Sequence, residues 1–180
     1  MKLTTRMKNL DSSVQQKINQ WLEGRYDENA KQEIRSLIEQ EKYEELTDAF
    51  YKDLEFGTGG LRGIMGVGSN RVNKYTFGVA TQGFSNFLKK TYPDHQIKVA
   101  IAHDCRNNSD TLAKVVADVF SANGIKVYFF EGLRPTPELS YAVRELNCQG
   151  GVVLTASHNP KEYNGFKAYG ADGGQLVSPH

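Results

Sequence analysis

The chain has 180 residues, of which 24% are charged and 39% are hydrophobic, and its formal net charge is +1 at pH 7. This length suffices for one α/β core with a helical appendage. A near-neutral charge excludes the basic surface that proteins use to bind nucleic acid or anionic membranes. We therefore expect neither partner, and a phosphate ligand would have to be bound by a few placed side chains.

The sequence predicts neither a signal peptide nor a membrane span. Its first ten residues are too polar for a signal-peptide core, and no apolar run approaches the ~20 residues that cross a bilayer. The two cysteines, Cys105 and Cys148, lack CxxC or metal-ligand spacing. Because a disulfide framework is not expected, the predicted location is cytoplasmic.

Residues 1–54 predict a helical extension. Ser12 or Ser13 can cap a first helix, and Asp27 can start a second one, before a third that ends near Phe50. Apolar residues recur at helical spacing in all three: Val14, Ile18, Trp21 and Leu22, then Ile34, Leu37 and Ile38, then Tyr43, Leu46 and Phe50.

Residues 55–180 predict an α/β domain. A glycine-dense loop at 57–68 precedes a helix that follows Asn73. Further helices are capped near Ser109 and Thr136, and they alternate with buried strands at 97–102, 125–130 and 151–154. This alternation predicts a three-layer α/β/α domain with a mixed, mostly parallel sheet. Residues 165–177 are expected to form a hairpin-like edge.

The segment Thr155–Pro160, which we call the serine loop, follows the last buried strand. Loops at the carboxyl ends of strands usually carry the ligand-binding side chains of open α/β sheets. Because Pro160 restricts Asn159 to extended conformations, the loop should expose the Ser157 hydroxyl beside His158. From these residues alone, an ordinary serine or asparagine turn is the simpler interpretation. A hydrolase pair is disfavoured, since no G-x-S-x-G motif surrounds Ser157.

The glycine run near residue 57 does not match a nucleotide-binding fingerprint. A G-x-G-x-x-G motif that starts at Gly57 would need glycine at position 62, which is Arg62. No strand–helix frame surrounds the run, and no G-x-x-x-x-G-K-[ST] motif occurs in the chain. A nucleotide-binding domain is therefore disfavoured.

Two motifs together point to a family. The serine loop resembles the phosphoserine signature of the α-D-phosphohexomutases, the phosphoglucomutase and phosphomannomutase superfamily, and residues 164–167 (Asn-Gly-Phe-Lys) resemble the next motif of that family. The resemblance extends to residues 55–63, 70–71 and 80–83, and to the helical extension around Trp21. It covers essentially the whole chain and most resembles the branch of bacterial α-phosphoglucomutases and phosphopentomutase-like enzymes.

The resemblance implies that Ser157 is phosphorylated in the resting enzyme. Ser157 would pass its phosphoryl group to a hexose phosphate and recover the other phosphate from a bisphosphorylated intermediate. The phosphoryl group thereby moves between positions 1 and 6 of the sugar. The family further implies Mg²⁺, bound through the phosphate of Ser157 with its other ligands outside this chain, and a hexose 1,6-bisphosphate as activator and intermediate.

The resemblance also implies roles for other residues. The catalytic set would be Ser157, His158 and Lys167. Residues implied to bind substrate or phosphate are Arg62, Thr58, Asn159 and Arg106. Either His158 or Lys167 can exchange a proton with a sugar hydroxyl, so the identity of the proton-transfer group stays open. From spacing alone, Lys167 is more simply a solvated strand lysine, whereas Arg106 either orders the loops or forms a structural ion pair.

Members of the family are four-domain enzymes, and residues 55–180 correspond to domain I. The sequence contains no Asp-Gly-Asp-x-Asp-Arg metal loop and no Gly-Glu-x-Ser-Gly sugar loop. We therefore expect an inactive fragment whose partners are a sugar phosphate and the remaining domains of the same polypeptide. The alternatives are a phosphopentomutase that acts on ribose or deoxyribose phosphates and a non-catalytic phosphosugar-binding module.

Overall fold

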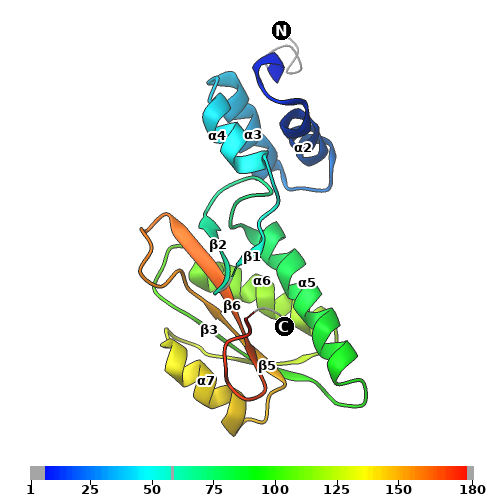
Figure 1. Cartoon of the computed structure of the whole chain (residues 1–180), viewed down its shortest axis with the longest axis vertical. Coiled ribbons are helices and arrows are strands. Elements are labelled where there is room, and N and C mark those ends of the chain that lie inside the picture. The colour runs from blue at the N-terminus through cyan, green and yellow to red at the C-terminus, as the bar shows by residue number, and fades with distance from the viewer. Residues whose placement is uncertain (1–6, 58, 178–180) are drawn as a thin grey trace. The chain divides into compact units, whose positions relative to one another are not determined.

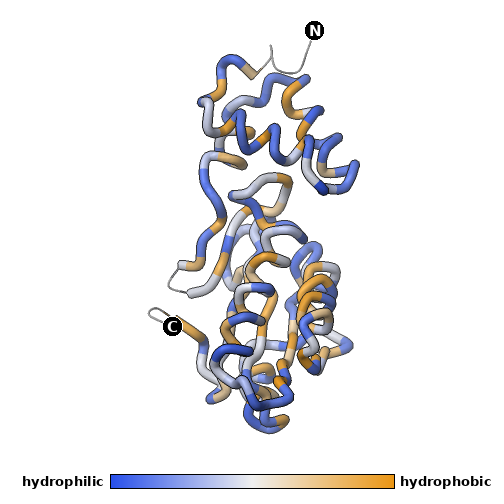
Figure 2. Tube along the Cα trace, turned by 90° about the vertical axis from the view of Figure 1, so that its right-hand side faces the viewer, coloured by the Kyte–Doolittle hydropathy of each residue, from blue (hydrophilic) through white to orange (hydrophobic). Residues whose placement is uncertain are grey.

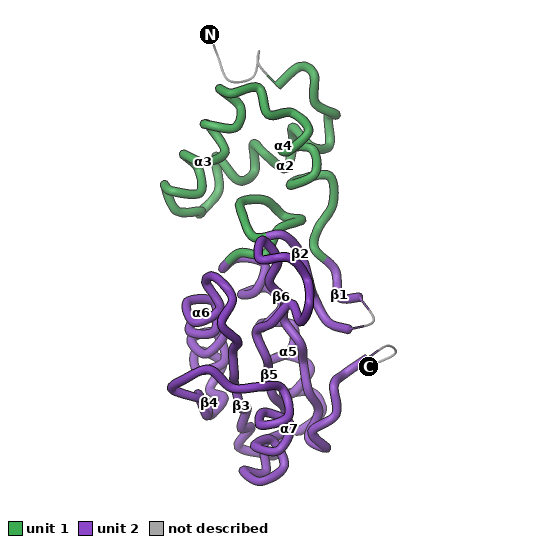
Figure 3. The backbone as a smooth tube through the Cα atoms, turned by 90° about the vertical axis from the view of Figure 1, so that its left-hand side faces the viewer, with its two compact units in different colours: residues 1–54, 65–73 green, residues 55–64, 74–180 purple. Residues whose placement is uncertain are grey.

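The computed structural model describes residues 7–57 and 59–177, so the predicted phosphate ligand Thr58 lies outside the described residues. The chain forms two compact units, coloured separately in Figure 3. One comprises Met1–Leu54 with Met65–Asn73, and the other comprises Glu55–Ile64 with Lys74–His180. None of the described helices is long and apolar enough to cross a membrane.

The first unit consists of a short 3₁₀ helix and three α-helices. They are η1 (Met7–Asn9), α2 (Ser12–Glu23), α3 (Glu28–Glu39) and α4 (Tyr43–Phe50). Hydrophobic and hydrophilic residues alternate along these helices in Figure 2, as expected where one side of each helix is buried. The three predicted α-helices are confirmed. The first is capped by Asp11, whose carboxylate accepts the Ser13 N–H, and not by Ser12 or Ser13 as expected.

Residues 65–73 pack against α4 and belong to the helical unit. The amide Nδ2 of Asn70 donates to the Asp48 carbonyl, and Arg71 forms a 2.7 Å ion pair with the Asp48 carboxylate. A Cβ on Gly68 would lie 2.4 Å from the Ala49 carbonyl oxygen, so only glycine fits this close approach. The sequence predicts a division of the chain between residues 54 and 55, whereas the helical unit also contains residues 65–73.

The second unit is built on one six-stranded sheet in the order β1-β2-β6-β5-β3-β4. The strands are β1 (Phe56–Gly57), β2 (Gly60–Ile64), β3 (Lys98–His103), β4 (Lys126–Phe129), β5 (Gly150–Leu154) and β6 (Tyr163–Gly170). Strand β3 pairs in parallel with β4 and β5. The pairs β1–β2, β2–β6 and β5–β6 are antiparallel.

Helices cover both faces of this sheet, which confirms the predicted three-layer α/β/α domain (Figure 1). Helices α5 (Lys74–Thr91) and α6 (Ser109–Ala122) pack together on one face, and α7 (Thr136–Glu145) packs on the other. The two glycines of β5 show the alternation: Gly150 faces Phe84 of α5, whereas Gly151 faces Val143 of α7.

The sheet differs from the prediction at its glycine-rich end. The segment expected to be a loop contains the β1–β2 hairpin. Gly60 permits this arrangement, because it has φ +107° and its Cα approaches β6 so closely that a Cβ would lie 2.5 Å from the Phe166 carbonyl oxygen.

Strand β6 also differs from the prediction. The expected hairpin is present, since Gln175 bridges Tyr169 in antiparallel fashion across a turn in which Gly170 N–H donates to the Gly174 carbonyl. It does not lie at an edge, because residues 165–170 belong to β6 in the interior of the sheet, between β2 and β5. The sheet is mixed as expected, but three of its five strand pairings are antiparallel, so it is not mostly parallel. The prediction missed β1 and β2, and these two strands account for two of the antiparallel pairings.

Candidate active site

Three strands end at the edge of the sheet that carries the serine loop. Strand β5 runs parallel to β3, and β2 and β5 are each antiparallel to β6, so β2, β3 and β5 point the same way. The serine loop follows β5, and residues 104–106 follow β3. Arg62 lies in the middle of β2 and pairs with Gly165 of β6, whose carbonyl oxygen accepts the N–H of Thr155 at the start of the loop. Strand pairing therefore brings segments that are far apart in sequence to one edge, where ligands of α/β sheets usually bind.

The serine loop exposes the hydroxyl of Ser157 from a fixed backbone. Ala156 is fully buried and anchors the loop, whereas Ser157 and His158 are exposed. Ser157 adopts a left-handed conformation with φ +55°, and its N–H donates to Thr155 Oγ1 at 2.9 Å. A non-glycine residue held in this region costs on the order of 1 kcal/mol or more, and such strain clusters at functional sites. The loop is thus a rigid support for one exposed hydroxyl group.

Arg106 fills the space behind the loop. Its Nη2 donates to the carbonyl oxygens of Ser157 (2.8 Å) and Asn159 (2.6 Å). Its Nη1 donates to those of Pro160 (2.8 Å) and Tyr163 (3.1 Å), and its Nε faces the Asp104 carboxylate at 3.5 Å. Every N–H of the guanidinium therefore has a partner in the chain. In this conformation Arg106 orders the loop and offers no donor to a phosphate.

A buried hydrogen-bond network supports Arg106. Asp104 Oδ1 accepts the backbone N–H of Arg106 at 3.0 Å and the Ser109 hydroxyl at 2.9 Å. Asn164, fully buried at the start of β6, donates to Ser109 Oγ at 2.9 Å. The sequence predicts a helix cap near Ser109 and a family motif that begins at Asn164, but it does not indicate that Asp104, Ser109 and Asn164 support Arg106. A polar asparagine next to the apolar core of a strand was the available signal, since buried amides need partners.

Arg62 reaches the serine loop from β2. Its Nη1 donates to Asn159 Oδ1 at 2.6 Å, so these two predicted phosphate ligands touch each other. Arg62 pairs with Gly165, two residues from Lys167 on β6, which places Arg62 and Lys167 on the same face of the sheet. The Lys167 ammonium is half-buried and makes no hydrogen bond or ion pair with any described residue. Two cationic side chains thus lie on the face beside the loop.

His158 is the nearest ionisable neighbour of the serine hydroxyl. Its Nδ1 lies 3.4 Å from Ser157 Oγ, which is long for a hydrogen bond. This contact is too weak for a nucleophile–base pair but leaves the imidazole close to any group attached to Oγ. Ser157, His158, Asn159 and Arg62 therefore occupy one surface, with Lys167 on the adjoining strand.

This surface suits a tetrahedral oxyanion such as a phosphoryl group on Ser157, because cationic donors adjoin an exposed hydroxyl. It does not form a metal site by itself. Among residues 7–57 and 59–177, no group of three or more His, Cys, Asp or Glu side chains is placed to hold a metal ion.

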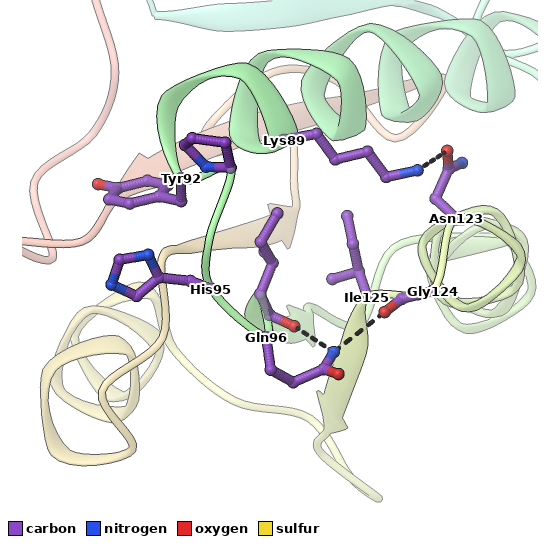
Figure 4. A pocket seen from close by; sticks show the side chains of 9 residues that line it. Lys89, Tyr92, His95, Gln96, Asn123, Gly124 and Ile125 are labelled. Atoms are coloured by element: carbon purple, nitrogen blue, oxygen red, sulfur yellow. Dashed lines mark hydrogen bonds between the residues drawn. The ribbon is translucent and has the colours of Figure 1, made fainter.

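A separate cleft lies at the opposite edge of the sheet. It has a volume of about 170 Å³ and is lined by residues around the C-terminal end of α5 and the starts of β3 and β4, among them Lys89, His95 and Ile125 (Figure 4). The Lys89 ammonium points toward Asn123 and donates to its Oδ1 at 2.9 Å. The cleft contributes no residue to the site at the serine loop.

Comparison with known proteins gives a consistent result. A family profile described as phosphoglucomutase/phosphomannomutase, alpha/beta/alpha domain I, matches residues 53–180. A phosphopentomutase of Mus musculus is 39% identical over 95% of this chain and 29% of its own length. A phosphoglucomutase of Staphylococcus epidermidis is 41% identical over 79% of this chain and 26% of its own length.

A solved structure shows the same similarity. The crystal structure of a Thermus thermophilus protein assigned as a phosphomannomutase superimposes with a TM-score of 0.64 at 33% identity, covering 71% of this chain and 28% of that one. The chain thus spans less than a third of the length of each of these three proteins.

Proposed function

This chain belongs to the phosphoglucomutase/phosphomannomutase family through its α/β/α domain I, and we propose that its Ser157 is the phosphoryl carrier of a sugar-phosphate mutase. The observation that carries the proposal is the exposed Ser157 hydroxyl, held in a left-handed conformation at the carboxyl edge of the sheet. A non-catalytic binding module would have no use for a strained, exposed phosphoryl acceptor.

The proposed reaction has two transfers. In the first, the bond between phosphorus and Ser157 Oγ breaks while phosphorus bonds to a hydroxyl oxygen of the sugar phosphate, and the hydroxyl proton passes by way of His158 or Lys167 to the leaving Oγ. In the second, the phosphorus of the other phosphate bonds to Ser157 Oγ while its bond to the sugar oxygen breaks, and the serine proton passes back to that sugar oxygen. Arg62 would neutralise charge on the moving phosphoryl group, and the rigid loop would keep Oγ in line with the acceptor.

The proposed substrate is a hexose phosphate, with phosphoryl transfer between positions 1 and 6 and a hexose 1,6-bisphosphate as activator. A phosphopentomutase is the second candidate, because a relative of that name is 39% identical over 95% of this chain. We expect Mg²⁺ at the phosphoserine, with its other ligands supplied by further domains of the polypeptide. Both cysteines are free thiols, which supports a cytoplasmic location.

The proposal is tested in the full-length protein by intact-mass analysis after incubation with glucose 1,6-bisphosphate. The wild type should carry one phosphate, and the Ser157→Ala variant none. Equal labelling of both proteins would exclude Ser157 as the acceptor. Turnover of glucose 1-phosphate and ribose 1-phosphate by the wild type, measured side by side, then decides between the two substrates.

A further inference from the structure

We infer that Arg106 is the positioning residue that sets the direction of the Ser157 hydroxyl, acting from behind the loop and not on the substrate. The inference rests on the proposed function of Ser157 and assigns the residue on which its geometry depends. Of the roles expected for Arg106, it sets phosphate binding aside and specifies what ordering of the loops means for Ser157.

The hydrogen bonds of the loop locate this role. The N–H of Ser157 is held by Thr155 Oγ1 at 2.9 Å, and its carbonyl oxygen is held by Arg106 Nη2 at 2.8 Å. Both peptide groups that flank the Cα of Ser157 are therefore fixed, and these groups define its φ and ψ. Thr155 is part of the loop itself, whereas Arg106 comes from a different strand end, 51 positions earlier. Among the described contacts of Ser157, the one with Arg106 ties its orientation to the rest of the sheet.

The chemistry of the guanidinium suits four separate carbonyl groups. The oxygens of Ser157, Asn159, Pro160 and Tyr163 all belong to the loop or its exit into β6; the bonds to Asn159 and Tyr163 are half-buried, and those to Ser157 and Pro160 are exposed. A planar fork with donors pointing in fixed directions can reach all four. A lysine ammonium concentrates three donors at one point and cannot span the same set.

The guanidinium is itself held in place by residues from two further elements. Asp104 faces Nε and accepts the backbone N–H of Arg106, and Ser109 at the start of α6 donates to Asp104. Asn164 of β6 donates in turn to Ser109. Hydrogen bonds thus connect Arg106 to the end of β3, the start of α6 and the start of β6. These connections make Arg106 a rigid support for the loop.

The consequence for catalysis is geometric. In-line phosphoryl transfer requires Oγ, phosphorus and the acceptor oxygen to be aligned, and a misplacement of about 1 Å costs on the order of 10²-fold in rate. Loss of the Arg106 fork should therefore lower kcat by about 10–100-fold and change KM for the sugar phosphate by less than about threefold.

The test compares Arg106→Lys with Arg134→Lys in the full-length protein. Both substitutions keep the charge. Arg134 is an exposed arginine whose guanidinium pairs with Glu138 at 3.1 Å and with the Leu133 carbonyl, and neither of these partners belongs to the serine loop. Hydrogen exchange is measured at the amides of Ser157, Asn159 and Tyr163, each of which is hydrogen-bonded within residues 155–163. A third variant, Arg106→Ala, is assayed for kcat with and without added guanidinium chloride at low concentration.

The expected result is at least tenfold faster exchange of these amides in Arg106→Lys, unchanged exchange in Arg134→Lys, and partial recovery of kcat in Arg106→Ala on addition of guanidinium. Wild-type exchange rates in Arg106→Lys, or a KM that rises while kcat stays constant, would overturn the positioning role. Failure of the wild type to take up phosphate would refute the proposed function alone, since the exchange measurement needs no turnover. If Arg106→Lys loses its far-UV circular dichroism, the exchange measurement is set aside and the kcat of Arg106→Ala decides. A kcat of Arg106→Ala that added guanidinium does not raise would then overturn the inference.

Discussion

Replacing Gly165 with alanine tests how closely the strands pack beneath the serine loop. A Cβ on Gly165 would lie 2.6 Å from the Thr155 carbonyl oxygen and 2.9 Å from the Leu61 carbonyl oxygen. Thr155 follows β5 and Leu61 belongs to β2, so the two oxygens lie on opposite sides of β6. A shift of β6 that relieves one contact therefore tightens the other.

The magnitude follows from the distances. Ordinary contacts of a Cβ begin near 3.4 Å, so the two neighbouring backbones would have to separate by roughly half an ångström or more each. Backbone is less able to yield than a side chain, and overpacking of this kind costs about 1–3 kcal/mol. We expect a loss near the middle of that range, about 2 kcal/mol, which lowers Tm by roughly 4–8 °C for a chain of this size.

The matched control is Gly83→Ala in α5, where nothing lies within 4 Å of the added Cβ. An alanine in a helix interior is favoured over glycine by about 0.8–1.0 kcal/mol, so this variant should raise Tm by roughly 2–4 °C. Both variants are measured by thermal unfolding followed with far-UV circular dichroism. The same substitution should thus change stability in opposite directions at the two positions. A Gly165→Ala protein as stable as the wild type would show that the strands do not pass as closely as described.

Three further predictions concern the site, the isolated chain and one helix cap. Lys167→Ala in the full-length protein should lower kcat by about 10²–10⁴-fold, the usual contribution of a positioned proton-transfer group, while exposed Lys161→Ala should not; near-normal turnover of the first variant would assign the proton to His158 or water. The 180-residue chain should fold on its own but not isomerise glucose 1-phosphate with Mg²⁺ and bisphosphate, and measurable glucose 6-phosphate in a coupled assay would contradict this. Asp27→Ala removes the acceptor for the Ala30 N–H at 2.9 Å and should cost about 1 kcal/mol, visible as a lower unfolding midpoint in urea.

Local patterns in the sequence were enough for most helices and for the strands that lie between them. Apolar spacing identified α2 to α4, and Asp27 was recognised as the cap that its bond to Ala30 confirms. Where a cap was wrong, the true one was a close neighbour: Asn108, and not Ser109, precedes α6. Periodicity and capping depend on residues within about one helical turn, and this is why a single sequence reveals them.

The serine loop was also found from sequence, because its residues are contiguous and resemble a family motif. Roles that depend on contacts between distant segments stay open at the level of sequence. For Arg106 the sequence allows phosphate binding, ordering of the loops or a structural ion pair, and its bonds to carbonyl groups 51 to 57 positions away favour the second. Asp104, Arg106 and Ser109 are neighbours along the chain, but the bond from Asn164 to Ser109 spans 55 positions and is not indicated by any local pattern.

The sequence by itself determined which segments are helical, where β3, β4 and β5 lie along the chain, and which serine is exposed at a strand end. Only the tertiary structure decided that β6 lies inside the sheet, that Arg62 contacts Asn159, and that Arg106 holds the backbone of Ser157. The physical reason is that strand pairing and hydrogen bonds from side chains to carbonyl groups join residues that are far apart in the sequence. Their spacing follows no regular repeat, so no pattern along the chain reveals these contacts. Such contacts are selected by steric fit and by the need to satisfy buried polar groups once the sheet has formed.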